Sequence, residues 1–197
     1  ITDVNTMVMH LLNEQVLVFD EFAADINQDG IINITDLNAL VMMVLEGRQE
    51  YIRKAKGHKA TPGNFTSDCI TVGDLAIANG ETREIELSLN NSRTYSAMQF
   101  DIDMPEGLVI VPGSLTCTSR NSGHTALLSS RNDRIMLLSS KGDAINGSEG
   151  AVLKMKVTAT QNVYGDITIS RPVFSTPQCE TYVGSDTYAL VSNTSGV

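Results

Sequence analysis

The sequence predicts a protein of two unlike domains: a small all-α module in residues 1–47 and an all-β sandwich of about nine strands in residues 69–197. Apolar residues recur at helical spacing in the first part, and they alternate with polar residues in the second. The charge also changes, since residues 1–47 hold eight Asp or Glu and no Lys or Arg, whereas residues 48–68 hold five basic and two acidic residues. Residues 48–68 are therefore interpreted as a linker.

The helical module contains a repeat. Residues 1–12, Ile-Thr-Asp-Val-Asn-Thr-Met-Val-Met-His-Leu-Leu, align with residues 34–45, Ile-Thr-Asp-Leu-Asn-Ala-Leu-Val-Met-Met-Val-Leu. Each copy opens on Thr-Asp, which is a helix-start signal, and continues with apolar residues at helical spacing. We therefore expect two amphipathic helices packed face to face, the second ending at Gly47, with a shorter helix between them in residues 16–24.

A twelve-residue acidic loop, residues 25–36, precedes the second helix. Calcium prefers six to eight oxygen ligands, and an EF-hand-type loop supplies them from positions 1, 3, 5, 7, 9 and 12. These positions hold Asp25, Asn27, Asp29, the carbonyl of Ile31, Asn33 or a water bound to it, and Asp36. Gly30 at position 6 permits the sharp turn. The loop therefore predicts a structural Ca²⁺ site.

Position 12 departs from the EF-hand signature, which has a bidentate Glu where this loop has the shorter Asp36. Asp can still chelate if the loop closes more tightly. The alternative is an Asx-rich turn in which Asp36 acts as an acid at the helix N-terminus. The first repeat copy begins at the last three positions of the equivalent loop, so we expect that loop to be truncated.

Residues 1–47 closely resemble a type I dockerin domain, through the loop motif from Asp25 to Leu37 and the duplicated helix start. The resemblance implies two loop-helix repeats that pack in antiparallel fashion and bind a cohesin partner, in assemblies of polysaccharide-degrading enzymes and related surface systems. In that family the residues at loop positions 10 and 11 recognise the partner. This implies partner-binding roles for Ile34 and Thr35, and for Ile1 and Thr2 in the other copy.

From Cys69 onward, short alternating segments are separated by turn signals such as Asn79-Gly80 and Pro112-Gly113. Strands at this spacing predict a β-sandwich of jelly-roll type. Four stretches are similar to cohesin domains and their carbohydrate-binding relatives: residues 85–90, 98–108, 145–157 and 165–169. The resemblance covers nearly all of residues 69–197 and implies a cohesin-like fold, although sandwiches of unrelated function share the same alternation.

The chain carries a formal net charge of −9, which argues against nucleic acid as a partner. Its longest apolar run, residues 40–45, is far shorter than the roughly 18 residues of a membrane span. The cysteines are expected to be small buried residues, or one disulfide and one free thiol in an exported protein, and they are Cys69, Cys117 and Cys179.

No catalytic constellation is visible. The three histidines fall on a helix, in the linker and in a loop, and they are His10, His58 and His124. Asp101 and Asp103 alternate on one strand face, where a solvated outer surface is the ordinary explanation. The chain has no Trp, so the flat aromatic platform of many sugar-binding sites is missing.

We therefore expect a non-catalytic, calcium-stabilised interaction and assembly protein of a bacterial polysaccharide-utilising or cell-surface system. The expected partner is a cohesin- or dockerin-type domain, with the second domain of the same chain as one candidate. The resemblance implies an extracellular, cell-surface or periplasmic location. Two alternatives stay open: a carbohydrate-binding accessory module of a glycoside hydrolase system, which would bind a polysaccharide, and an EF-hand sensor that opens with calcium.

Overall fold

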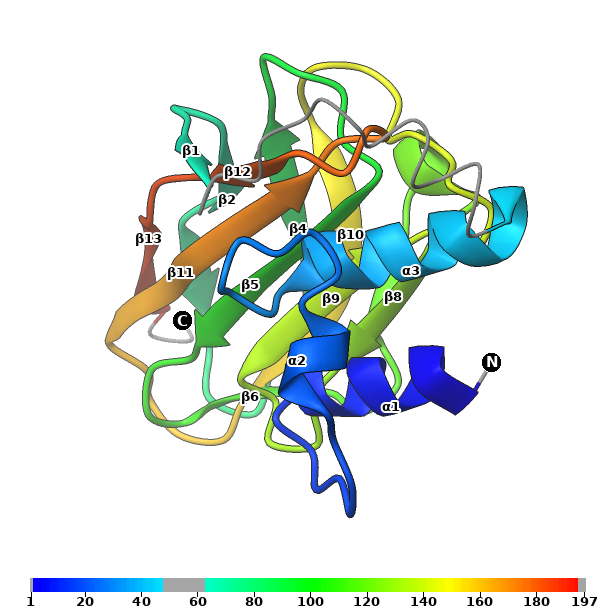
Figure 1. Ribbon diagram of the computed structural model, residues 1–197. Helices are drawn as coiled ribbons and strands as arrows, with labels where there is room; N and C mark the ends of the chain where they lie inside the picture. Colours follow the sequence, from blue (N-terminus) through cyan, green and yellow to red (C-terminus); the bar gives the residue numbers. More distant parts are fainter. Residues whose placement is uncertain (1, 48–62, 195–197) are drawn as a thin grey trace.

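The computed structural model describes residues 2–47 and 63–194 (Figure 1). The helices are α1 (Thr2–Leu11), α2 (Glu21–Ala24) and α3 (Ile34–Glu46), with a 3₁₀ turn, η1, at Ser119–Asn121. The strands are β1 (Asn64–Phe65), β2 (Cys69–Val72), β3 (Leu75–Ile77), β4 (Thr82–Asn90), β5 (Ala97–Asp103), β6 (Leu108–Ile110), β7 (Thr116–Cys117), β8 (Thr125–Leu128), β9 (Arg134–Leu138), β10 (Ala151–Ala159), β11 (Gly165–Ser175), β12 (Thr181–Val183) and β13 (Thr187–Asn193).

The strands form a sandwich of two sheets. Sheet A has eight strands in the order β1-β12-β11-β5-β9-β8, with β13 beside β11 and β3 beside β13, and sheet B has five, in the order β2-β4-β10-β6 with β7 beside β10. Pairing in the described residues is antiparallel except for β1 with β12 and β13 with β3. The predicted sandwich is confirmed. It has more strands than the nine expected, because several are only two or three residues long.

The long helices α1 and α3 lie on the outer face of sheet A (Figure 1). Both begin at a Thr-Asp segment as the repeat predicts, and Gly47 follows α3 with a φ of 85°. The expected middle helix is shorter than residues 16–24, because it spans only Glu21–Ala24. Asp20 caps its N-terminus, because the Asp20 side chain accepts a hydrogen bond from the N–H of Ala23 at 3.1 Å.

Strand β9 shows why the helices lie there. Ile135 and Leu137 face the core between the sheets, whereas Met136 and Leu138 belong to a second apolar cluster with residues of α1 and α3. A strand covered on both faces has an unbroken apolar sequence instead of an alternating one. The run Ile-Met-Leu-Leu in β9 is therefore explained by the helices that cover it.

The sandwich begins earlier than the predicted boundary at residue 69. Asn64–Phe65 forms β1 and pairs with β12. Asp68 is also buried, and its carboxylate accepts hydrogen bonds from the Tyr95 hydroxyl at 2.5 Å and the Ser92 N–H at 2.9 Å. The last residues of the predicted linker are thus part of the fold, because a buried carboxylate needs these fixed donors.

Residues 48–62 of the predicted linker, together with Ile1, lie outside the described residues.

All three cysteines are partly buried, and they form no disulfide. No helix among residues 2–47 and 63–194 is long and apolar enough to cross a membrane.

Candidate functional site

The acidic loop is held by hydrogen bonds from its own backbone. The Asp25 carboxylate accepts hydrogen bonds from the N–H groups of Asp29 and Gly30, at 3.1 and 3.0 Å, and the side-chain oxygen of Asn27 accepts one from Asp29 at 3.0 Å. Gly30 has a φ of 86°, in the left-handed region that glycine tolerates best. The loop therefore makes the sharp turn expected at position 6.

Asp36 closes the loop and starts α3. It is fully buried, and its two carboxylate oxygens accept backbone hydrogen bonds from Ile26, Asn27 and Asn33 at 2.9, 3.2 and 3.0 Å. Asn33 in turn caps α3 by accepting a hydrogen bond from the N–H of Thr35 at 2.7 Å. Burial raises the pKa of Asp36 to about 6, and these hydrogen bonds act in the opposite direction. A cation in the loop would favour its ionised form.

The donor set fits calcium, because the six predicted positions supply only oxygen ligands. Two amide groups now donate to loop oxygens: Asn27 to Asp29 at 2.9 Å and Asn33 to the Ile31 carbonyl at 3.4 Å. Among the residues that the structure describes, no group of three or more His, Cys, Asp or Glu side chains is arranged so that it could hold a metal ion. A bound Ca²⁺ would replace these amide contacts at the Asp29 carboxylate and the Ile31 carbonyl. Hydrogen bonds of this kind also suit an Asx-rich turn, so calcium stays a prediction.

The partner-binding pair implied by the resemblance lies against sheet A. Ile34 and Thr35 are both fully buried. Ile34 belongs to the apolar cluster that includes Met136 and Leu138, and the Thr35 hydroxyl accepts a hydrogen bond from the Thr181 hydroxyl at 3.0 Å. In the other copy, Thr2 begins α1, and Ile1 is outside the described residues. The chain's own sandwich thus covers the second pair.

One turn further along α3, Asn38 makes a polar contact in this apolar interface. It is only 3% exposed, and its amide nitrogen lies 3.0 Å from each of three acceptors: the hydroxyls of Ser96 and Ser175 and the carbonyl of Thr176. Ser96 precedes β5, and Ser175 ends β11. These contacts fix the helix along its axis, because a buried amide loses its partners if it slides.

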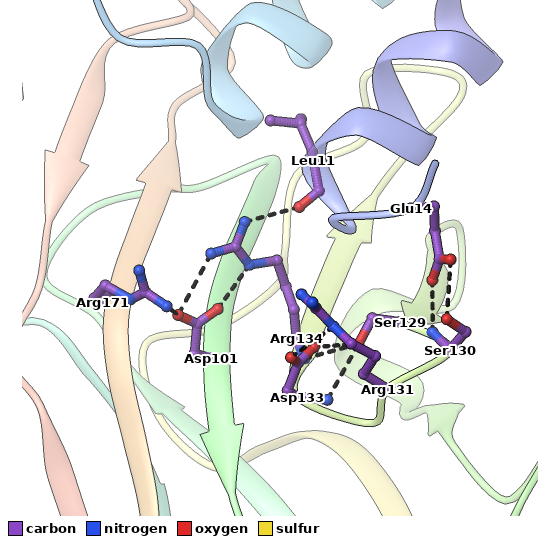
Figure 2. Close-up of polar contacts among 9 residues, drawn as sticks. All are labelled: Leu11, Glu14, Asp101, Ser129, Ser130, Arg131, Asp133, Arg134 and Arg171. Atoms are coloured by element: carbon purple, nitrogen blue, oxygen red, sulfur yellow. Dashed lines mark hydrogen bonds and ion pairs between the residues drawn. The ribbon is translucent and has the colours of Figure 1, made fainter. Parts of the chain in front are cut away.

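A second anchor holds the end of α1 (Figure 2). Arg134 donates to the carbonyl of Leu11 at 2.9 Å and to the Asp101 carboxylate at 2.6 Å, and Arg171 pairs with the same carboxylate. A cation at a helix C-terminus is favourable, because the last carbonyls carry partial negative charge. The expectation of a solvated Asp101 is wrong, since its side chain is only 13% exposed, whereas Asp103 is exposed as expected.

Glu14, just after α1, makes a third contact across the interface (Figure 2). Its carboxylate accepts hydrogen bonds from the backbone N–H of Ser130 at 2.7 Å and from the Ser130 hydroxyl at 2.9 Å. These bonds lower the pKa of the Glu14 carboxyl group, with the backbone bond as the larger cause. We call the surface of sheet A that contacts α1, α3 and Glu14 the docking face.

The polar residues of the docking face were not predicted from the sequence. Two features of the sequence nevertheless indicate that such an interface exists. The unbroken apolar run at 135–138 indicates a strand that is buried on both sides. Asn38 is a polar residue between the buried apolar residues Leu37 and Ala39, and such a residue needs hydrogen-bond partners. Neither signal says which segments meet.

Replacing Arg134 by Met is expected to lower the free energy of unfolding by about 2 to 4 kcal/mol, because Asp101 and the Leu11 carbonyl lose a largely buried partner. Urea denaturation measures this. Arg131→Met is the matched control, since Arg131 is 60% exposed and its ion-pair partner Asp133 is half exposed, and it should change stability by about 0.5 kcal/mol or less. Equal effects of the two substitutions would contradict the anchoring role of Arg134.

No protein-family model matches the sequence, and no curated protein matches it. Solved structures of cohesin modules are similar to it. A non-cellulosomal cohesin from Archaeoglobus fulgidus has a TM-score of 0.54 and 10% identity, over 66% of this chain and 93% of that chain. The sixth cohesin of Acetivibrio cellulolyticus scaffoldin B, in complex with a Cel5 dockerin mutant, has a TM-score of 0.53 and 13% identity, over 66% of this chain and 100% of that one.

A type I cohesin–dockerin complex from Clostridium thermocellum contains a third similar chain, with a TM-score of 0.52 and 11% identity, over 70% of this chain and 100% of that chain. At such low identities these likenesses establish the fold alone. The predicted cohesin-like sandwich is therefore confirmed as a fold.

Proposed function

We propose that this chain is a non-catalytic protein–protein interaction unit of a bacterial assembly, in which a dockerin-like helical module is docked on the cohesin-like sandwich of the same chain. The observation that carries the proposal is the burial of Ile34, Thr35 and Asn38 on the docking face. Two of the similar solved structures are complexes of a cohesin with a dockerin. A similar contact between the helical module and the sandwich of this one chain would account for the position of α3 on sheet A.

Calcium has a defined place in this proposal. Asn33 and Asp36 are both predicted ligands, and they also form the capping box of α3. Ile34 and Thr35 lie between them in the sequence, and both are buried on the docking face. A cation bound in the loop would therefore stiffen the turn that presents these residues, so its role is structural and supports docking.

The alternatives account for less of the structure. A carbohydrate-binding accessory module would suit the sandwich, but it does not explain why the predicted partner pair of the helices is buried. A calcium sensor of the EF-hand type exposes an apolar groove between its helices. Here Met7, Leu11 and Leu37 already share an apolar cluster with sheet A. A bacterial cell-surface, extracellular or periplasmic location, in polysaccharide use, completes the proposal on the basis of the dockerin and cohesin resemblances.

Intramolecular docking is tested by placing a protease site between residues 48 and 62 of the full chain and cutting it after folding. The two fragments are expected to elute together from a gel-filtration column in millimolar calcium, because the docking face holds them without the covalent link. Adding a chelator should separate them or broaden the peak. Fragments that separate immediately in calcium would refute stable docking, and the uncut chain on the same column is the control.

A further inference from the structure

Three large apolar side chains on the helical module stand almost fully in solvent. Leu17 and Val18, between α1 and α2, are 97% and 83% exposed, and Phe22 in α2 is 91% exposed. Single exposed apolar residues are ordinary on a protein surface, but clustered ones mark interaction sites. These three lie within six consecutive residues, and we call them the apolar tip.

The segment that carries Leu17 and Val18 is held at both ends. Before the tip, Glu14 is bonded to Ser130 of the sandwich. After Val18, the ring of Phe19 stacks on His10 with centroids 3.8 Å apart, and Asp20 caps α2. Phe19 therefore packs against the module, whereas its two predecessors face outward. In Figure 1 this segment projects away from the sandwich, below α1 and α2.

Charge restricts what can cover the apolar tip. Asp20 and Glu21 lie between Val18 and Phe22 in sequence, and residues 2–47 contain no Lys or Arg. The described sandwich, residues 63–194, holds nine Lys or Arg against fourteen Asp or Glu. Residues 48–62 hold five Lys or Arg and one Glu, but elsewhere a second copy would bring acidic surface to acidic surface, which opposes association. An anionic membrane is disfavoured for the same reason.

We propose that the apolar tip is the docking site for a different protein, one that presents an apolar patch bordered by Lys and Arg. Leu17, Val18 and Phe22 fill the apolar patch, and Asp20 and Glu21 face its basic border. This surface lies outside the buried residues of the docking face. The site therefore requires neither calcium nor a particular partner for the sandwich, and it goes beyond the function proposed above.

The probe for this site is a synthetic amphipathic helical peptide with Leu along one face and Lys along the other, added to the isotope-labelled full chain. NMR is expected to show amide shifts confined to residues 14–22, and the binding should weaken as salt is raised. The double substitution Leu17→Ser and Val18→Ser should weaken binding about tenfold or more, because exposed apolar anchors dominate such contacts. Both side chains are exposed, so the fold is retained.

The matched controls separate the possible sources of binding. Leu190→Ser removes a 56% exposed leucine on β13 of the sandwich, and it should leave the affinity unchanged. A peptide with Glu in place of Lys should not bind. The proposal is overturned by equal binding of the Glu peptide, by shifts centred on the sandwich, or by the absence of any shift. It is also overturned if the unchanged protein forms a concentration-dependent dimer, or binds phosphatidylcholine–phosphatidylglycerol vesicles, and the double variant no longer does so.

Discussion

Replacing Ile34 by Asp is expected to release the helical module from sheet A and to lower the free energy of unfolding by about 3 to 5 kcal/mol. Ile34 is fully buried in the apolar cluster with Ala97, Met136 and Leu138. The substitution removes a whole aliphatic side chain from that cluster and puts a carboxylate in its place. Urea denaturation measures the loss. Hydrogen exchange should show faster exchange in β5 and β9, whose outer faces lose their cover.

Val44→Asp is the matched control, because Val44 lies on the same helix with 62% of its side chain exposed. It makes the same kind of chemical change without disturbing the docking face, and it should change stability by about 0.5 kcal/mol or less. If both variants melt alike and β5 and β9 exchange as in the unchanged protein, the contact between α3 and the sandwich contributes little to stability.

Removing calcium is the second change with a large expected effect. For one site with a dissociation constant near ~1 μM, about 1 mM calcium adds roughly 4 kcal/mol to the folded state. A chain of this size would then melt roughly 10 °C lower in excess chelator than in calcium. The effect should reach the sandwich, because the loop ends in the cap of α3 and α3 lies on the docking face. Differential scanning calorimetry and isothermal titration calorimetry measure the two quantities.

Asp25→Asn should abolish most of this shift, since it removes the charged oxygen ligand at position 1 of the loop. Glu21→Gln is the control, because Glu21 is a nearby exposed acid outside the loop. Magnesium should stabilise much less than calcium, since it requires a smaller and more regular octahedron of oxygens. No heat of binding and no calcium-dependent melting shift would rule out the metal site and leave the Asx-rich turn.

Local features of the fold could be predicted from the sequence because their physical causes are local. The Thr-Asp segments and the apolar spacing located α1 and α3, and alternation with turn residues located most of the strands. The middle helix was overestimated, because apolar residues recur at helical spacing through residues 16–24. Asp20 caps a helix that starts only at residue 21, and the preceding residues extend from the anchor at Glu14.

The docking face could not be predicted, because its partners are distant in the sequence. The apolar faces of α1 and α3 showed that these helices would be buried and the repeat predicted that they pack face to face, but the sandwich of the same chain was only one candidate partner and its contact residues were not identified. The bulge in β11 is a similar case. In the structure this strand continues through a register shift between Ser170 and Val173, where Arg171 has a φ of 52°. Pro172 follows, and Arg171 reaches Asp101.

The contact between Asn38 and Thr176 spans 138 residues of chain, and this spacing affects biosynthesis. At about 5–20 residues per second, the ribosome needs roughly seven to thirty seconds to add that length after α3 has been made. During this interval Ile34, Leu37 and Leu11 have no sheet to cover them. The nascent helices therefore lack the apolar surface of sheet A that covers them in the folded protein until β11 has been synthesised.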